Sequence, residues 1–444
     1  MSNKDQRTIS RKILTAEIEN LSHEGRGVTH INGKTVFIHG ALPGETVKFY
    51  YTRQQSKFSE GQTTEVISPS PKRVEPPCPY FRFCGGCSLQ HLAHQAQLKH
   101  KQHVLREQLQ HFAKTLPQTW LLPIQGPAWA YRRKARLGVR YVKGKKQVLV
   151  GFRERNGRYI TDMHGCKILH PSVGERIDAL RELINNLSIN TDIPQIEVAV
   201  GDDHAALIFR HLQAFSEQDL EQLKQFGSEH DLWIYLQPGN IKSVHRLYPD
   251  TDENDRLLLD LSEHDVKLRF FPTDFTQVNF DINHKMLAQA LRLLDLQATD
   301  KVLDLFCGLG NFSLPMARHC QSVTAVEANQ TMVERGSENA ALNNIHNTRF
   351  YAADLMQDCS EHEWAKQSYD KLLLDPPRSG AQMIVENIEL FGANHIVYIS
   401  CNPATLARDI GILVNKGFQL IQAGIMDMFP HTTHVESIAL LTRT

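Results

Sequence analysis

Apolar runs alternate with helical sequence through the C-terminal part of the chain, and this order constrains the fold more than any other feature. After the phrase PTDFTQVNF, apolar runs recur in VLDLFCG, SVTAVEAN, FYAADL, KLLLDPPRSG and HIVYIS, with helix-like sequence between them. Strands that alternate with helices form parallel sheets whose faces the helices cover. We therefore predict a Rossmann-like α/β domain over residues 273–444.

Glycines and acids follow the strands of this predicted sheet. Gly308 and Gly310 follow the first strand, Glu327 ends the second, and Asp354 follows the third. Glycines let a backbone approach a ligand, and acids at the carboxyl edge can accept hydrogen bonds from ribose hydroxyls or an exocyclic amine. The pattern predicts an adenosyl-binding site, although the full GxGxxG fingerprint is absent. The alternative is an ordinary doubly wound sheet with acidic turns.

A cysteine after the fifth strand adds a nucleophile to the same edge. Cys401 stands in IVYISCNPATLARD, after an Asp-Pro-Pro-Arg loop that begins at Asp375, and Glu436 lies 35 positions further on. A thiolate can add to carbon 6 of uracil and so activate carbon 5, after which a carboxylate can remove the carbon-5 proton. We expect uracil-5 methylation. The Asp-Pro-Pro-Arg loop alone is also compatible with an amine methyltransferase. A lone cysteine is also compatible with a buried thiol that has no catalytic role.

The N-terminal residues show the alternation of apolar and polar side chains that is typical of strands in a small β-barrel. Apolar and polar residues alternate in KTVFIHGALPGETVKFYYTRQQSKFSEGQTTEVI, with Gly and Pro turns between the runs. The Pro-rich phrase SPSPKRVEPPCPY ends this domain. We predict a barrel over 1–72, a central α+β domain over 73–272, and the α/β domain over 273–444. A helix over 90–115 is a candidate to pack on the catalytic domain.

Charge is divided unevenly along a chain whose formal net charge is zero. Residues 1–150 contain 24 Lys and Arg against 9 Asp and Glu, and the remainder contains 25 against 40. The densest stretch, from Tyr131 to Tyr159, has eleven basic residues and one acid, Glu154. Clustered positive charge favours a polyanion such as RNA, with an affinity that falls as salt rises. The alternative is a solvated sheet face.

Three cysteines, Cys78, Cys84 and Cys87, fall within ten residues. The chain has no apolar run long enough to span a membrane and no signal peptide, so we expect a cytoplasmic protein whose cysteines are not disulfides. A cysteine triplet in that compartment indicates a metal site, and Cys166 is the best candidate for a fourth thiolate. An iron–sulfur cluster and zinc both fit this spacing.

The motifs, taken in order, resemble those of the RNA uracil-5 methyltransferases that use S-adenosylmethionine. They are HEGRGVTHINGKTVFIHGALPGETV, which is similar to the TRAM domain, an OB-like barrel, followed by CxxxxxCxxC, FTQVN, DLFCGLGNFSL, DPPR, SCNPATLARD and HVESIALL. The resemblance is strongest to members that act on 23S ribosomal RNA, because transfer-RNA relatives generally lack the TRAM domain and the cysteine cluster.

This resemblance implies a role for each matching position. It implies Cys401 as the nucleophile and Glu436 as the base. The implied contacts of S-adenosylmethionine are Gln277, Phe306, Asn311, Glu327, Asp354 and Asp375. The implied ligands of a 4Fe-4S cluster are Cys78, Cys84, Cys87 and Cys166.

The target base must be single-stranded or flipped out, because its carbon 5 cannot be reached inside a duplex. Phe271 and Phe275 are candidates to stack on it, and His431 and His434 are candidates to orient the base that removes the proton. We expect a monomer. Two other classes are an RNA-binding scaffold, which the catalytic cysteine and glutamate argue against, and a radical methylase, whose usual CxxxCxxC spacing is absent.

Overall fold

The computed structural model describes residues 12–155, 157–251 and 255–443, which form two compact units by contact. The first unit runs to Arg82 and also contains Gly86–Val104 and Phe429–Thr433. The second contains Phe83–Gly85, Leu105–Met428 and the chain from His434 onward. Residues 1–11 of the predicted barrel domain lie outside the described part of the chain.

The first unit contains a six-stranded sheet in the order β1-β5-β6-β4-β3-β2. Its strands are β1 (Leu14–Glu17), β2 (Asn20–Leu21), β3 (Gly27–Ile31), β4 (Lys34–His39), β5 (Thr46–Gln54) and β6 (Phe58–Ser68). Alternate residues of β4 and β5 are buried, namely Val36, Ile38, Val47 and Phe49. Three register shifts between β5 and β6 bend the sheet. The predicted period of two is confirmed here.

Helix α1 (His94–Gln108) continues into a π-helical turn, η1 (Leu109–Ala113). Its apolar side chains Leu98, Val104, Leu105 and Leu109 are buried, but Phe112 is 50% exposed. The turn packs on helix α9 (Pro403–Asn415). Gly411 of α9 allows this approach, because a Cβ there would lie 3.3 Å from the Cα of Ala113.

The second unit contains another six-stranded sheet, in the order β13-β12-β11-β10-β8-β9. Its strands are β8 (Lys134–Val142), β9 (Gln147–Gly151), β10 (Gln195–Val200), β11 (Ala205–Arg210), β12 (Leu232–Gln237) and β13 (His245–Tyr248). Helix α4 (Glu217–His230) connects the parallel pair β11 and β12. A ribbon of β14 (Leu257–Leu261) and β15 (Val266–Phe270) follows.

Two helices separated by a short break follow β9 in the chain, α2 (Pro171–Gly174) and α3 (Ile177–Asn186). The backbone N–H of Cys166 donates to the carbonyl of Gly174 at 2.9 Å, and a Cβ on Gly174 would lie 2.4 Å from the carbonyl oxygen of Cys166. This close backbone approach requires glycine at the break.

An eight-stranded sheet forms the rest of the second unit, in the order β18-β17-β16-β19-β20-β22-β21-β7. Its strands are β7 (Thr119–Trp120), β16 (Lys301–Leu305), β17 (Ser322–Glu327), β18 (Thr348–Ala352), β19 (Lys371–Leu374), β20 (His395–Ser400), β21 (Gln419–Met426) and β22 (Glu436–Thr442). The five neighbouring strands β18, β17, β16, β19 and β20 are parallel, which confirms the predicted sheet.

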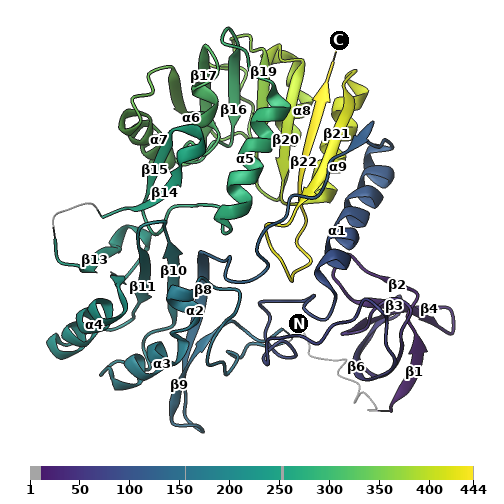
Figure 1. Ribbon diagram of the computed structural model, residues 1–444, viewed down its shortest axis with the longest axis vertical. Helices are drawn as coiled ribbons and strands as arrows, with labels where there is room; N and C mark the ends of the chain where they lie inside the picture. The colour runs from purple at the N-terminus through teal and green to yellow at the C-terminus, as the bar shows by residue number, and fades with distance from the viewer. Residues whose placement is uncertain (1–11, 156, 252–254, 444) are drawn as a thin grey trace, which may run out of the picture. The chain divides into compact units, whose positions relative to one another are not determined.

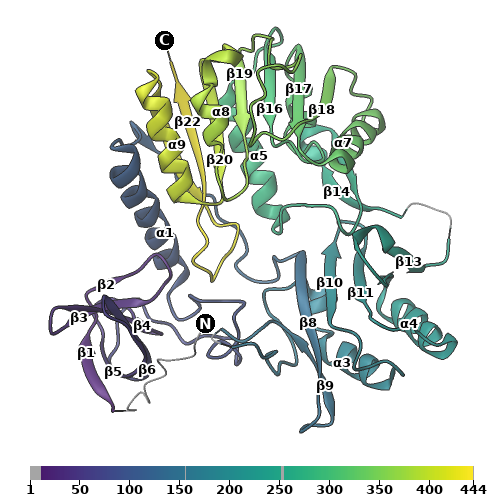
Figure 2. The same cartoon turned by 180° about the vertical axis from the view of Figure 1, so that it is seen from behind.

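Helices cover both faces of this sheet. Helix α5 (Phe280–Leu294) lies in front of it in Figure 1, whereas α9 is in front when the molecule is seen from behind in Figure 2. Helices α6 (Ser313–Ala317), α7 (Gln330–Leu342) and α8 (Gln382–Glu386) complete the layers. Strands covered on both faces are continuously apolar, and the side chains of Val302, Leu303 and Leu305 are accordingly inaccessible to solvent.

Candidate active site

Four loops meet at one edge of the eight-stranded sheet. Strands β16, β17, β19 and β20 are parallel neighbours in register, so their carboxyl ends coincide. In open α/β sheets ligands bind at this edge. The edge carries several of the predicted site residues: Phe306, Glu327, Asp375 and Cys401.

The loop after β16 has an unusual backbone. Phe306 has a φ of +67°, and its N–H donates to the carbonyl of Val326 at 2.9 Å. A positive φ is uncommon for an aromatic residue and often marks a functional site. Gly308 has a φ of +55°, and no described atom lies within 4 Å of where its Cβ would be. Its N–H donates to Oε2 of Glu327 at 3.3 Å, so the acid on β17 fixes a loop that leaves room for a ligand.

The other predicted cofactor residues make local contacts. Asn311 forms a reciprocal pair of amide hydrogen bonds with Asn283 of α5, at 2.9 and 3.0 Å. Asp354 is exposed after β18, and its Oδ1 accepts from the N–H of Met356 at 3.0 Å. Gln277 is half-buried in the segment before α5. Asn311 is thus held in one orientation, while Asp354 keeps an exposed carboxylate next to the edge.

Sequence reasoning missed Asp304, which is completely buried within β16. Burial raises its pKa to about 8, and the negative charges of Asp375 and Glu327 add to this effect. The Ser313 hydroxyl donates to its Oδ2, which partly opposes the rise. Burial also raises the pKa of Asp375 to about 7. The available signal was an aspartate within the apolar run VLDLF.

Cys401 and Glu436 lie at the ends of two adjacent strands. Strands β20 and β22 are antiparallel, and Ser400 pairs with Ser437. Cys401 is the next residue beyond this pair on one strand, and Glu436 is the next on the other. Asn402 follows as the N-cap of α9, and its side-chain amide donates to the carbonyl of Arg378 at 3.0 Å. This bond ties the cysteine turn to the Asp-Pro-Pro-Arg loop.

The electrostatic surroundings of the thiol oppose its ionisation. The pKa of Cys401 is raised to about 11, first by burial and then by the negative charges of Glu436 and Asp375. The Arg378 guanidinium acts in the opposite direction. Since a thiolate is the reactive form, a nucleophilic role requires further stabilisation of its charge when substrate is bound.

The segment before α5 presents one aromatic side chain to solvent. The carboxylate of Asp274 is buried and accepts hydrogen bonds from the N–H of Phe271 at 2.7 Å and from Nε of Arg335 at 2.9 Å. Phe271 packs edge-on against Tyr235, with ring centroids 5.6 Å apart. Phe275 is 70% exposed. Of the two candidate stacking residues, Phe275 therefore has the accessible ring.

The two candidate orienting histidines have different partners. The Nδ1 atom of His434 lies 3.3 Å from Nη2 of Arg378. His431 belongs to the first unit, where its N–H and Nδ1 contact the Gln97 amide. His434 thus contacts the Asp-Pro-Pro-Arg loop, whereas His431 contributes to the packing of its own segment.

The four cysteines predicted to bind metal form no disulfide. Cys84 and Cys87 are buried, and Cys78 and Cys166 are half-buried. Cys78 and Cys87 belong to the first unit, and Cys84 and Cys166 to the second. Among the described residues, no group of three or more His, Cys, Asp or Glu side chains is arranged to hold a metal ion. The prediction therefore depends on the kind and spacing of the residues.

Some basic residues of the stretch from Tyr131 to Tyr159 make internal contacts and do not contribute to an exposed basic surface. Arg133 forms an ion pair with Asp202 at 2.9 Å, and its guanidinium lies 4.3 Å from the centroid of the Phe280 ring. Lys134 donates to the carbonyl of Asp274, and burial lowers its pKa to about 8. These two cations join the central sheet to the start of α5 and to the segment before it.

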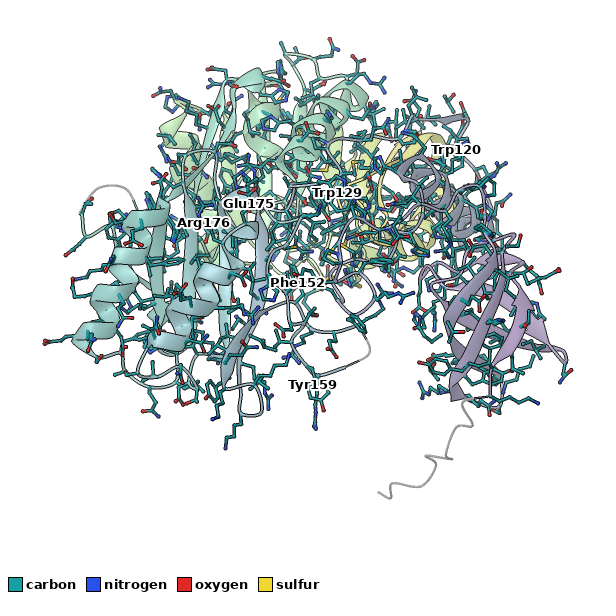
Figure 3. All side chains as sticks on the ribbon, turned by 60° about the horizontal axis from the view of Figure 1, so that its bottom comes forward. Trp120, Trp129, Phe152, Tyr159, Glu175 and Arg176 are labelled. Atoms are coloured by element: carbon teal, nitrogen blue, oxygen red, sulfur yellow. The ribbon has the colours of Figure 1, made fainter. Side chains whose placement is uncertain are left out.

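The rest of this stretch supplies an exposed basic surface. Tyr159 is 59% exposed and points away from the ribbon in Figure 3. The guanidinium carbon of Arg158 lies 5.9 Å from the centroid of the Tyr159 ring. The exposed basic residues on β8, in the turn between β8 and β9 and in the loop after β9 are Arg136, Arg140, Lys143, Lys145, Lys146, Arg153 and Arg158.

Comparisons with known proteins agree with these features. The family model described as tRNA (Uracil-5-)-methyltransferase matches residues 93–444, and the TRAM domain model matches residues 7–64. The 23S rRNA (uracil(1939)-C(5))-methyltransferase RlmD of Alcanivorax borkumensis is 52% identical over 428 residues, 96% of each chain. The protein of the same name from Hahella chejuensis is 49% identical over 443 residues, 99% of each.

A solved structure shares the fold. It is the Pyrococcus abyssi tRNA (uracil-54, C5)-methyltransferase in complex with S-adenosyl-L-homocysteine, with a TM-score of 0.74 and 20% sequence identity, covering 97% of this chain and 100% of that chain. Within the described part of the chain, no helix has the length and apolar character that crossing a membrane requires. On the match over residues 93–444 and the identity to full-length relatives, this chain belongs to the RNA (uracil-5-)-methyltransferase family and carries a TRAM domain.

Proposed function

We propose that this enzyme transfers a methyl group from S-adenosylmethionine to carbon 5 of one uridine in 23S ribosomal RNA. The observation that carries the proposal is the position of Cys401 and Glu436 at the ends of β20 and β22, beside the loop edge of a methyltransferase sheet. Relatives named as 23S ribosomal RNA enzymes match nearly the whole chain, which supports the choice of substrate.

The loop edge fits an adenosyl ligand. The open space at Gly308 lets backbone approach the cofactor, and Glu327 stands at a strand end where a carboxylate can accept from ribose hydroxyls. When bound, S-adenosylmethionine supplies an electrophilic methyl group on a sulfonium. We assign its binding to Gln277, Phe306, Asn311, Glu327, Asp354 and Asp375.

Cys401 and Glu436 divide the remaining chemistry between them. The Cys401 thiolate forms a bond to carbon 6 of the uracil, and the electron pair of the 5,6 double bond becomes available at carbon 5. Carbon 5 forms a bond to the methyl group as the bond from that group to sulfur breaks and leaves its electron pair on sulfur, so that carbon 5 then carries both the methyl group and its original hydrogen. Glu436 removes this proton, the 5,6 double bond re-forms, and the sulfur–carbon bond breaks to release the thiolate.

For Cys401 to act as a nucleophile, nearby positive charge must lower the raised pKa of its thiol. Arg378 lowers the pKa of Cys401, and the N-terminus of α9, which begins two residues later, is a positive dipole end. Asp375 has a pKa of about 7, so near neutral pH a large share of it is protonated and opposes the thiolate less. Binding of the uracil then completes the activation.

The RNA-binding surface in this proposal is basic and aromatic. The exposed ring of Phe275, two residues before Gln277, is placed to stack on an unpaired base, and the exposed cations of β8 and of the loops on either side of β9 are suited to phosphates. The TRAM barrel adds a second RNA-binding element. RNA affinity should therefore fall as salt rises.

We also propose that Cys78, Cys84, Cys87 and Cys166 hold a 4Fe-4S cluster. Four thiols that form no disulfide match the donor chemistry of such a cluster, and zinc is the rival occupant. Methyl transfer needs no electrons, so we assign the cluster a structural role. In this proposal the enzyme is a cytoplasmic monomer with a barrel over 1–72, a central domain over 73–272 and a catalytic domain over 273–444.

Mass mapping of methylated uridines in 23S ribosomal RNA tests the proposal. A strain without this protein should lack one 5-methyluridine, and the purified enzyme should restore it to the unmodified RNA. RNA with 5-fluorouracil at that position should trap a covalent complex through Cys401, because fluorine cannot leave as a proton does. Methyl transfer to an amine without a trapped complex would instead favour the amine methyltransferase.

A further inference from the structure

The loop that carries Arg378 is bonded to α9 within the second compact unit. The side-chain amide of Asn402 donates to the carbonyl of Arg378 at 3.0 Å, and the hydroxyl of Thr405 donates to the same carbonyl at 3.3 Å. The guanidinium of Arg408 donates from Nη2 to the carbonyl of Ser379 at 2.9 Å. Side chains from the N-cap and first turns of one helix thus hold two consecutive residues of the loop.

Asp409 bonds the next part of the loop. Its side chain is completely buried. Its Oδ2 accepts from the N–H of Ala381 at 2.8 Å and from the Tyr398 hydroxyl at 2.6 Å. Its Oδ1 accepts from Nε of Arg408 at 2.8 Å. Tyr398 lies on β20, three residues before Cys401. One buried carboxyl therefore joins the loop, α9 and the strand that precedes the proposed nucleophile.

Gly380 allows the loop to approach α9 this closely. Its φ is +79°, and a Cβ there would lie 2.6 Å from Nη2 of Arg408 and 2.6 Å from Oδ2 of Asp409. A larger residue would displace both groups and would disfavour this backbone conformation. Arg408 and Asp409 belong to the motif SCNPATLARD, and the proposed chemistry gives neither of them a task. Their contacts with the loop indicate what that task is.

The position of the loop matters because of the charges around Cys401. Burial has the largest effect on the pKa of the thiol and raises it, the charges of Glu436 and Asp375 raise it further, and that of Arg378 lowers it. Nη2 of Arg378 lies 3.3 Å from Nδ1 of His434, in the chain just before β22. Since the interaction between two charges weakens with distance, the effect of Arg378 depends on where the loop holds it.

We propose that Asp409 is a positioning residue that holds the Asp-Pro-Pro-Arg loop on α9, so that Arg378 stands where it stabilises the Cys401 thiolate. The inference rests on the nucleophilic role proposed above for Cys401. Asp409 acts through the loop and not through its own charge, because a negative charge opposes a thiolate. Its positioning and its charge therefore predict opposite effects when it is replaced.

The test measures how fast iodoacetamide alkylates Cys401 at pH 8 in the full-length enzyme, by peptide mass mapping. Asp409→Asn leaves one oxygen in place of the two that accept hydrogen bonds, and Arg408→Lys keeps the positive charge without the planar guanidinium. Glu389→Gln is the matched control. It is also a change from carboxylate to amide, and it removes an ion pair of 2.7 Å with Lys416, the C-cap of α9.

We expect Asp409→Asn to slow alkylation about 3- to 10-fold, because a cation that moves away from a thiol no longer lowers its pKa. Loss of the negative charge alone would speed alkylation, so the direction of the change separates the two effects. Arg408→Lys should slow alkylation less. Glu389→Gln should match wild type, and so should Leu413→Ala, which removes a buried side chain from the same helix. First-turnover methyl transfer to a transcript of the 23S ribosomal RNA region should slow in the same order.

Arg378→Met shows whether Asp409 acts through Arg378. If it does, Asp409→Asn should have no further effect on alkylation in an Arg378→Met enzyme, because two changes to one interaction are not additive. Additive slowing would overturn the inference, as would alkylation of Asp409→Asn at or above the wild-type rate. Slower alkylation with unchanged methyl transfer would also overturn it. If Asp409→Asn does not fold, Arg408→Lys in the same comparison decides.

Methylation by Cys401→Ala separates this failure from a failure of the proposed function. Alkylation reports the ionisation of the thiol whether or not the thiol attacks the uracil. Loss of methylation in Cys401→Ala, together with unchanged alkylation in Asp409→Asn, rejects only the positioning role. Near-normal methylation by Cys401→Ala rejects the covalent mechanism and the positioning role with it.

Discussion

Cys401 and Glu436 lie one residue beyond the Ser400–Ser437 pair of two antiparallel strands, and the charge of Glu436 raises the pKa of the Cys401 thiol. This proximity hinders formation of the thiolate in the free enzyme. In the proposed mechanism it also places a carboxylate next to the carbon that the thiol activates, which proton removal requires. The proposed mechanism therefore needs a change of charge near Cys401 on substrate binding, and Arg378 is a cation that favours the thiolate.

Replacement of the thiol should abolish turnover and spare cofactor binding. Cys401→Ala removes the group that adds to carbon 6, so we expect the methylation rate to fall below about one thousandth of wild type, which corresponds to a loss of about 4 kcal/mol of transition-state stabilisation. Calorimetry should show near-normal binding of S-adenosylmethionine. Cys359→Ala, at a buried cysteine beyond β18, is the matched control. A Cys401→Ala enzyme that retains more activity than this would contradict covalent catalysis.

Replacement of the base should stop the reaction at a later stage. Addition and methyl transfer precede proton loss, so Glu436→Gln should accumulate a methylated covalent adduct that survives denaturing electrophoresis. The adduct should carry the radioactive methyl group and disappear when Cys401 is also replaced by Ala. If Glu436→Gln turns over normally and forms no adduct, another group removes the proton.

The periodic parts of the sequence predicted most of the fold. The strands from β16 to β20 followed from their apolar runs, because strands covered on both faces are continuously apolar. The break between α2 and α3 could not be predicted from such a pattern. It depends on a backbone approach between Gly174 and Cys166, which are too far apart in sequence for a local pattern to indicate the contact.

Motifs indicated the candidate active-site residues, but not which of their side chains have shifted pKa values. The edge that carries Phe306, Glu327 and Asp375 followed from strand order. The raised pKa of Asp304 depends on burial among residues from several strands, which no local motif encodes. The packing of His431 in the first unit was missed for the same reason, since Gln97 is more than 300 residues away in sequence.

The raised pKa of Cys401 predicts slow alkylation that accelerates with pH. Iodoacetamide reacts with the thiolate, so with a pKa of about 11 the rate at Cys401 should rise about tenfold per pH unit from pH 7 to 9 without levelling off. Glu436→Gln removes a nearby negative charge and should speed the reaction at each pH, whereas Arg378→Met should slow it. Glu221→Gln on α4 is the control. Peptide mass mapping measures the rate, and a plateau near pH 8.5 would contradict the raised pKa.

Asp304 should make stability depend on pH. Its carboxyl has a pKa of about 8 in the folded chain and about 3.9 when unfolded, so the folded state binds the proton more tightly. The free energy of unfolding should therefore fall as pH rises from about 4 to about 8. Asp304→Asn cannot lose a proton, so its thermal midpoint relative to wild type should be higher at pH 8 than at pH 5. A pH-independent difference between the two proteins would show that Asp304 does not titrate in this way.

Metal content should distinguish the two occupants proposed for the cysteines. Anaerobically purified protein should be brown and contain about four iron atoms per chain if the site is a 4Fe-4S cluster. Cys84→Ser or Cys166→Ser should bleach it, whereas Cys320→Ser should not, because Cys320 is a buried residue of the catalytic sheet region. With a structural cluster, these ligand variants should lose thermal stability and RNA affinity before the methyl-transfer step itself is affected. Colourless protein with stoichiometric zinc would decide for zinc, and normal RNA binding and turnover without metal would refute the structural role.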